Sequence, residues 1–388
     1  MTRPAVAVLL AAAVGPAVPG PAADPAPTHL VYLGTYTGPK SRGIYVSRFD
    51  AVSGRLSPPE LAAETEGPSF LALHPTRPLL YAVNEVGEFE GKPAGSVTAF
   101  AIDASGALRA LNRVSSEGAH PCHLVVDRAG RHVLVANYTG GSLASLPIRE
   151  DGSLGPAAAV ARHRGRSVNP ERQEAPHAHA VEVDAANRVA LAADLGLDQV
   201  LAYRFDPDRG TLEPADPPHA AVRPGAGPRH LAFGRDGRHV YVLNELDVTV
   251  TAFRYEDGRM TEEATVSALP AGVKPGPEDS GAEVQVHPSG RFLYASLRGP
   301  DQVAVFSVDG GTGRLSLAQH VATGGRTPRS FSLDPSGRWL LAANQRSDSV
   351  TVFRVDPDTG RLSPTGHAVE VGSPVSVVFR PLVPPSGS

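Results

Sequence analysis

The sequence has little cysteine, little net charge and no long apolar segment. Because Cys122 is the single cysteine, an internal disulfide is excluded. The cysteine content therefore does not indicate whether the protein works in an oxidising or a reducing compartment. The formal net charge of −4 comes without a basic tract, so nucleic-acid binding has no support. The apolar run 5–14 is too short to cross a bilayer. A Gly-x-Ser-x-Gly motif is also missing, which argues against a covalent acyl-enzyme.

The N-terminus resembles a segment used for export. Arg3 precedes the apolar run, and small residues and prolines follow as far as Pro27. This order is typical of a secretory signal with cleavage between Ala17 and Ala23, the alternative being a disordered leader on a cytosolic protein. We expect residues 1–27 to be this signal peptide or leader and residues 382–388 to be a disordered tail. A cleaved signal predicts a periplasmic or secreted protein, and an uncleaved leader a cytoplasmic one.

The chain is rich in turn residues and repeats one pattern. It contains 40 glycines and 37 prolines, yet apolar residues alternate with polar ones throughout. The clearest copies read GPSFLALHPTRPLLYAVNE from Gly67, GPRHLAFGRDGRHVYVLNE from Gly227 and TPRSFSLDPSGRWLLAANQ from Thr327. Each copy is a strand, a His/Asp turn and a second strand, and two further strands follow. An all-strand repeat of roughly 50 residues indicates a β-propeller.

The number of copies predicts seven blades. Six complete copies begin near Gly67, Gly118, Pro176, Gly227, Ser280 and Thr327. The C-terminal segment 373–381 matches a first strand, and the N-terminal segment 29–38 matches a second strand. We therefore expect residues 28–381 to form one all-β, seven-bladed β-propeller with four-stranded blades, in which the two chain ends close one blade together. Such closure removes a free sheet edge.

The copies differ where function is expected, at the first strand and at the end of the second strand. In a propeller these segments meet at one mouth of the central channel, and most of the charged or imidazole side chains of the repeat lie there. The candidates are His123, His177, His179, Asp194, Arg229, His230, Asn244, Glu245, Glu283, Arg298, Arg329 and Gln345. Three guanidinium groups near one axis require anions, either from acidic side chains or from a ligand. Arginine suits a carboxylate or phosphate because its planar group forms two parallel hydrogen bonds.

Several of these residue types have ordinary structural explanations. His74 and His287 start the turn within the repeat, and asparagine recurs at the end of the second strand, so both features favour structural roles. His177 and His179 have a spacing seen in metal sites, but one such pair is weak evidence. Cys122 is better explained as a buried thiol than as a nucleophile. We expect no metal and no cofactor, and we favour Arg229 with Glu245 as the functional pair.

Further motifs give a family resemblance. The segments PHAHAVEVD, DLGLDQV, GPRHLAF, VYVLNEL, AEVQVHPSGRFLYASLRG and TPRSFSLDPSGRWLLAANQ resemble those of the seven-bladed 6-phosphogluconolactonases, whose family includes the carboxymuconate-lactonizing cycloisomerases. The resemblance covers residues from about His29 to Pro381. It implies an active-site set of His179, Arg229, Glu245 and Arg298. Leu297 departs from the pattern, which usually has asparagine before the arginine.

Together these observations predict a lactonase for a small anionic lactone or sugar acid. Arg229 and Arg298 would stabilise the oxyanion, and Glu245 and His179 would exchange protons with water and the ring oxygen. His123, His177, Asp194, His230, Asn244, Glu283, Arg329 and Gln345 would contact substrate. A muconate-type lactonizing cycloisomerase and a non-catalytic propeller that binds a sugar or a protein are the alternatives. We expect a monomer.

Overall fold

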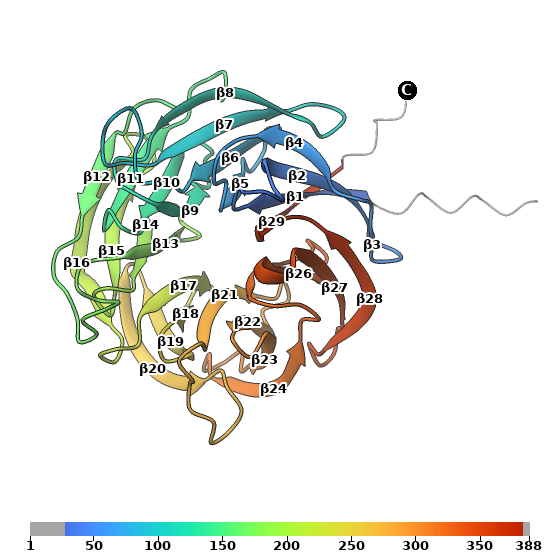
Figure 1. Ribbon diagram of the computed structural model, residues 1–388. Coiled ribbons are helices and arrows are strands. Elements are labelled where there is room, and N and C mark those ends of the chain that lie inside the picture. The colour runs from blue at the N-terminus through green and yellow to red at the C-terminus, as the bar shows by residue number, and fades with distance from the viewer. Residues whose placement is uncertain (1–27, 383–388) are drawn as a thin grey trace, which may run out of the picture.

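The computed structural model describes residues 28–382, which form a ring of seven antiparallel sheets around a central axis (Figure 1). The predicted seven-bladed β-propeller is therefore confirmed. The signal or leader predicted for 1–27, and nearly all of the predicted tail, lie outside the described residues and stay predictions. Between residues 28 and 382 no helix is long and apolar enough to span a bilayer.

Six blades have four strands that run from the axis outward in chain order. The first three blades consist of β5 (Leu71–Leu73), β6 (Leu79–Asn84), β7 (Ser96–Ile102) and β8 (Leu108–Ser115); β9 (Pro121–Val126), β10 (His132–Asn137), β11 (Ser142–Pro147) and β12 (Ala159–Arg162); and β13 (Ala178–Val183), β14 (Val189–Asp194), β15 (Gln199–Asp206) and β16 (Thr211–Ala221). The next three consist of β17 (Pro228–Phe233), β18 (His239–Asn244), β19 (Thr249–Glu256) and β20 (Arg259–Ser267); β21 (Ser280–Val286), β22 (Phe292–Arg298), β23 (Gln302–Val308) and β24 (Leu315–Ala322); and β25 (Pro328–Leu333), β26 (Trp339–Asn344), β27 (Ser349–Val355) and β28 (Leu362–Glu370). A short 3-10 helix, η1 (Gln345–Ser347), follows β26.

The seventh blade joins the two ends of the chain, as predicted. Its inner strand is β29 (Pro374–Pro381), which pairs with β1 (Thr28–Thr35), and β1 pairs with β2 (Gly43–Asp50). Its outer strand differs from the expected single strand, since β3 (Arg55–Leu56) and β4 (Glu60–Glu64) both pair with β2. Pro58 and Pro59 lie between them, and proline lacks the N–H that a continuous ladder needs.

Neighbouring blades are held together by apolar packing and by a repeated hydrogen bond. The second strands β6, β10, β14, β18 and β26 are buried at every position because a blade covers each face. Four buried tyrosine hydroxyls on second strands donate to a glycine carbonyl in the next blade: Tyr32 to Gly106, Tyr81 to Gly152, Tyr241 to Gly313 and Tyr294 to Gly360. His74 and His287 bond through Nε2 with the Gly130 and Gly337 carbonyls in the same way. Their role is structural, as expected.

Candidate active site

A β-bulge in each of six inner strands sets the residues that face the axis. In β13, the register passes from Ala178 to Ala180 while the partner strand advances by a single residue, so His179 is the extra residue. The same shift occurs at Cys122, Arg229, Arg329 and Val375 in β9, β17, β25 and β29. Strand β21 likewise has one extra residue between Gly281 and Val284. A bulge breaks the alternation of side chains and redirects the extra residue. The recurring bulge therefore presents His179, Arg229 and Arg329 to a common centre.

Glu245, at the end of β18, is the hub of this centre. Its Oε2 lies 2.8 Å from Arg229 Nε and 2.9 Å from Arg298 Nη2. Its Oε1 accepts a hydrogen bond of 2.6 Å from Arg172 Nη2. His179 Nε2 lies 4.0 Å from Oε2. The structure thus brings together His179, Arg229, Glu245 and Arg298, which three different blades supply.

These contacts fix the charge states in the centre. Burial by itself would raise the pKa of the Glu245 carboxyl, but Arg298, Arg229 and Arg172 hold it far below its usual value. Burial, and then Arg229, lowers the pKa of His179 well below its usual value, so its imidazole is neutral at pH 7. Burial and the neighbouring Arg298 lower the pKa of Arg229 to about 10. The centre therefore contains an ionised carboxylate, a neutral imidazole and charged guanidinium groups.

A second acid lies across the axis from Glu245. Glu85 accepts a hydrogen bond of 2.9 Å from Tyr36 Oη and another from the Ser69 hydroxyl. The Arg329 guanidinium carbon lies 5.3 Å from the centroid of the Tyr36 ring, which is a cation–π arrangement. Tyr36 and Glu85 thereby hold Arg329 beside the Glu245 centre.

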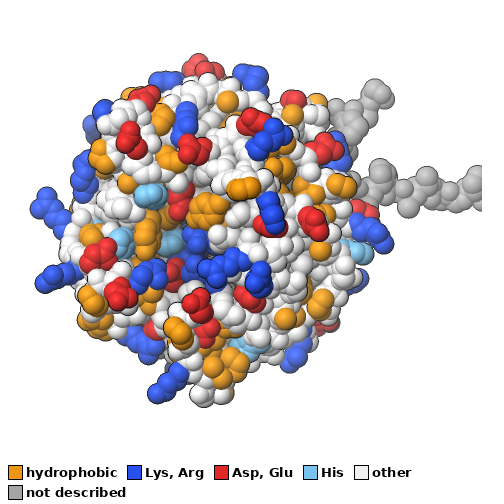
Figure 2. Space-filling view, in the orientation of Figure 1, with side chains coloured by type: hydrophobic (Ala, Val, Ile, Leu, Met, Phe, Trp, Pro, Cys, Tyr) orange, Lys and Arg blue, Asp and Glu red, His pale blue; other side chains and the backbone are white. Residues whose placement is uncertain are grey.

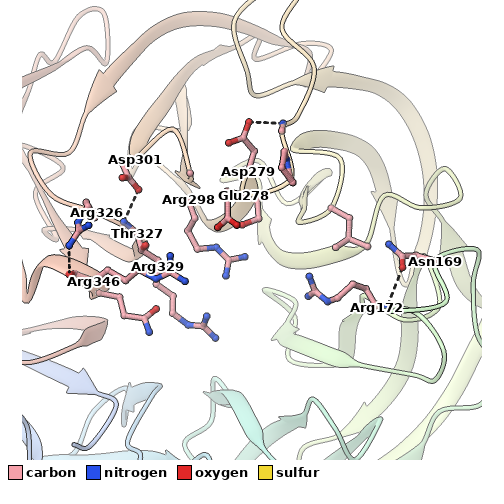
Figure 3. A pocket seen from close by; sticks show the side chains of 16 residues that line it. Asn169, Arg172, Glu278, Asp279, Arg298, Asp301, Arg326, Thr327, Arg329 and Arg346 are labelled. Atoms are coloured by element: carbon pink, nitrogen blue, oxygen red, sulfur yellow. Dashed lines mark hydrogen bonds between the residues drawn. The ribbon is translucent and has the colours of Figure 1, made fainter. Parts of the chain in front are cut away.

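Arg172 and Arg298, which contact Glu245, also line a cavity of about 680 Å³ at one mouth of the channel. Glu245, Arg229 and His179 are buried and do not line it themselves. Basic side chains gather around this opening in Figure 2. The arginines that line it are Arg172, Arg298, Arg326, Arg329 and Arg346, and Gln345 and the acids Glu278, Asp279 and Asp301 complete the wall. In Figure 3 the guanidinium groups of Arg172, Arg298 and Arg329 converge on the open middle of the mouth from the β12–β13 connection, β22 and β25. This arrangement suits an anionic ligand.

Three of the predicted contact residues do not lie at the expected mouth of the channel but further along its axis. His123 and His230 follow a bulged residue, and Glu283 lies within the bulge of β21. All three line a second cavity, of about 690 Å³, at the opposite end of the channel. The sequence comparison placed both first-strand positions at a single mouth. The structure separates them, because the residue that follows the bulge is directed further down the axis.

Two other predicted contact residues form hydrogen bonds with neighbouring side chains and backbone, away from the mouth cavity. Asp194 binds His163 Nδ1 at 2.6 Å and accepts the backbone N–H of His177. Asn244 Nδ2 donates to the hydroxyls of Thr249 and Thr251. Asp194 and Asn244 are fully buried and do not line the mouth cavity.

His177 is near the mouth but is held by its neighbours. Its ring stacks on Tyr138 with 4.5 Å between centroids, and its Nε2 lies 3.2 Å from Glu174. Within residues 28–382, no three His, Cys, Asp or Glu side chains are arranged to hold a metal ion. Burial raises the pKa of the Cys122 thiol, so it is not a thiolate at neutral pH.

The sequence comparison missed Arg172. This residue lies in the long connection between β12 and β13, outside the repeated segments, yet it forms one of the three contacts of Glu245 with arginine. The only available signal was the composition of that connection, where Arg164, Arg166 and Arg172 occur within a few residues. Repeat alignment cannot align a segment that has no counterpart in the other blades.

Comparison with known proteins gives one consistent family. The family model of the seven-bladed β-propeller lactonases matches residues 30–379. A 6-phosphogluconolactonase of Bacillus subtilis is 36% identical over 309 residues, which are 79% of this chain and 85% of that protein. Among solved structures, a putative 6-phosphogluconolactonase of Bacteroides fragilis superposes with a TM-score of 0.85 at 35% identity, covering 92% and 99% of the two chains. A periplasmic gluconolactonase of Pseudomonas aeruginosa superposes with a TM-score of 0.85 at 37% identity, and the match covers 92% of this chain and 100% of that one.

Proposed function

The chain belongs to the lactonase family of seven-bladed β-propellers, and we propose that it hydrolyses an anionic sugar lactone at the arginine-lined mouth of its channel. One observation carries this proposal: an ionised Glu245 holds Arg172, Arg229 and Arg298 together beside the neutral imidazole of His179. Lactone hydrolysis needs both elements, because it develops negative charge on the carbonyl oxygen and moves a proton from water.

Arg229 and Arg298 are the proposed oxyanion donors. Arg229 is only 2% exposed, and burial strengthens its interaction with a developing charge. Arg298 lies at the edge of the mouth cavity and is shared between Glu245 and the Gly281 carbonyl. A well-placed donor of this kind lowers the barrier by roughly 3–4 kcal/mol.

His179 is the proposed base, and Glu245 its electrostatic partner. Three guanidinium groups make Glu245 a very weak base, whereas neutral His179 has a nitrogen free to accept a proton. Water forms the new bond to the carbonyl carbon and gives its proton to His179. The resulting imidazolium lies 4.0 Å from the Glu245 carboxylate, which stabilises it. The C–O bond of the ring then breaks, and the ring oxygen takes the proton from His179.

The wall of the mouth favours a substrate with a second negative group. Arg326 and Arg346 extend the positive surface beyond Arg329, away from Glu245. A phosphate or carboxylate at the far end of the lactone would lie against them. The names of the relatives, 6-phosphogluconolactonase and gluconolactonase, include both a phosphorylated and an unphosphorylated substrate.

The proposal is tested by hydrolysis of 6-phosphogluconolactone and glucono-δ-lactone, followed by pH-stat titration. We expect the purified protein to hydrolyse both, with kcat/KM at least tenfold higher for the phosphorylated lactone. His179→Gln should lower kcat about 10²–10⁴-fold because it removes the base. His219→Gln, on the exposed surface of β16, is the matched control and should have no effect.

Other outcomes of the same assay would point elsewhere. Loss of ultraviolet absorbance from a muconate, without lactone hydrolysis, would assign the lactonizing reaction instead. Saturable binding of gluconate without turnover would assign a non-catalytic propeller. Equal activity of wild type and His179→Gln would contradict the proposed base.

We also propose that the protein is exported, as its N-terminal sequence predicts. The Pseudomonas relative that is 37% identical is named as a periplasmic protein, which supports this compartment. The expected result is a mature N-terminus between Ala17 and Ala23, measured by mass spectrometry of the protein purified from its own cells. Detection of a mature chain that begins at Met1 or Thr2 would contradict export by a cleaved signal.

A further inference from the structure

A column of titratable side chains continues from the Glu245 centre toward the opposite end of the channel. His179, beside Glu245, has its ring centroid 5.4 Å from that of His230. His230 Nδ1 lies 3.2 Å from Glu283 Oε1. His179, His230 and Glu283 are each at most 7% exposed. The column thus connects the reacting end of the channel with Glu283 through two imidazoles.

Glu283 faces open space on two sides. A cavity of about 10 Å³, with room for about one water molecule, lies between Arg229, His230 and Glu283. The same His230 and Glu283 line the cavity of about 690 Å³ at the far mouth. Glu283 Oε1 is bonded to His230 and to the Val284 N–H, whereas Oε2 forms no hydrogen bond with any of residues 28–382. A buried carboxyl oxygen is therefore free to exchange a proton with the far cavity.

Lactone hydrolysis leaves a proton to be removed. Attack by water and opening of the ring produce a hydroxyl group and a carboxylic acid, whose pKa of roughly 4 means that it ionises at neutral pH. Each turnover therefore releases one proton. The new carboxylic acid gives this proton to His179, whose imidazole is neutral again once it has returned the first proton to the ring oxygen. Arg172, Arg298 and Arg329 surround the substrate mouth and repel a hydronium ion, while the bound product blocks the same opening.

We propose that this proton leaves along the axis, from His179 through His230 to Glu283, and enters solvent at the far mouth. The proposal rests on the proposed lactonase function. His230 takes up a proton on one ring nitrogen and releases the other from Nδ1 to ionised Glu283. Glu283 then loses its proton to water in the far cavity. Glu283 acts through His230 and does not touch the substrate.

The electrostatic surroundings of Glu283 suit this exchange. Burial raises the pKa of its carboxyl to about 8, although Arg229 opposes the shift. Protonated and ionised forms are therefore both populated near neutral pH, as a proton carrier requires. The titratable and charged groups that line the two cavities around it are Glu85, Cys122, His123, Arg128, Glu182, Asp184, Arg229, His230, Arg235, Asp236, Tyr255 and Arg329.

The test is Glu283→Gln, assayed in weak and in strong buffer. In weak buffer we expect kcat to fall at least tenfold at pH 7 with KM unchanged. Wild-type kcat should rise toward pH 8 as the ionised fraction of Glu283 grows, and the variant should lose this rise. Imidazole or formate at tens of millimolar should restore the variant severalfold, because small carriers fit the far cavity and replace the missing carboxyl. Glu213→Gln, on the exposed face of β16, is the matched control and should behave as wild type.

A second readout does not depend on activity. Unfolded glutamate ionises near pH 4.5, whereas folded Glu283 stays protonated to about pH 8. The unfolded state binds fewer protons between these values, so this residue makes wild-type stability fall as pH rises. The Tm of Glu283→Gln relative to wild type should therefore increase from pH 4.5 to 8.

The outcomes separate the two proposals. A wild-type chain that hydrolyses no lactone would contradict the proposed function and the relay together. An active wild type with an equally active Glu283→Gln in weak buffer would overturn the relay alone. A slow variant that neither carrier restores would also overturn it, since Glu283 would then be structural.

Discussion

Replacing Arg229 by lysine should lower kcat for lactone hydrolysis about 10²–10³-fold with little change in KM. Arg229 uses Nε toward Glu245 and donates Nη1–H to the Ala282 carbonyl, so its planar group is fixed by the fold. Lysine keeps the positive charge but cannot reproduce that fixed, planar donor. The loss of one oxyanion donor typically costs this much in kcat. Steady-state kinetics with 6-phosphogluconolactone provide the measurement.

Arg254→Lys is the matched control for this substitution. Arg254 is an exposed residue of β19, in the same blade as Arg229, and the same chemical change there should leave kcat and Tm at wild-type values. A second check is the thermal unfolding of Arg229→Lys, which separates slow catalysis from loss of folded protein. An Arg229→Lys enzyme that is folded and as fast as wild type would contradict the role given to Arg229.

Glu245→Gln should destabilise the protein by about 3–5 kcal/mol and abolish measurable turnover. The carboxylate is 4% exposed and offsets the charges of Arg172, Arg229 and Arg298. Glutamine has nearly the same shape but no charge, so it leaves buried guanidinium groups without their anion. Those groups would separate, and His179 would lose the partner of its imidazolium. Denaturant unfolding monitored by the fluorescence of Trp339 measures the stability change.

Two controls test the stability change expected for Glu245→Gln: the substitution Glu64→Gln and the pH dependence of unfolding. Glu64 forms a surface ion pair with Arg42, both side chains being more than 60% exposed, and its loss should cost under about 1 kcal/mol. The folded-state pKa of Glu245 lies below its unfolded value of 4.5, so its stabilisation is complete above about pH 4.5. The difference between wild type and Glu245→Gln should shrink as pH falls below that value. A difference that is independent of pH would contradict the electrostatic explanation.

The blades were predictable from the sequence because each repeats one local pattern. The strands around His74 and His287, the turn that each begins and the shared blade of segments 29–38 and 373–381 follow from alternation and turn chemistry alone. The same reasoning gave the wider list of candidates, since equivalent positions of a closed ring must meet at its axis. The family resemblance then singled out His179, Arg229, Glu245 and Arg298 from that list.

The position of each side chain along the channel axis could not be predicted from the repeat. The bulges at His179 and Arg229 add one residue to a strand, and strict alternation gives no sign of them. The bulge of β17 separates His230 from the substrate mouth, and that of β21 separates Glu283 from it. Arg172 was missed because it belongs to a connection specific to one blade, and its position depends on tertiary contacts with Glu245 and Tyr138.

The pairing of β1 with β29 also constrains when the protein becomes complete. His29 lies opposite Pro381, and Leu33 lies opposite Val377, so the first and last strands depend on each other. A ribosome must finish almost the entire polypeptide before β29 exists. Until then β1 has an unpaired edge and the circle of blades stays open. Contacts between such distant parts of a chain form slowly, and an unpaired edge is prone to aggregation. Biosynthesis of this protein therefore includes a late stage in which one edge of β1 is still exposed.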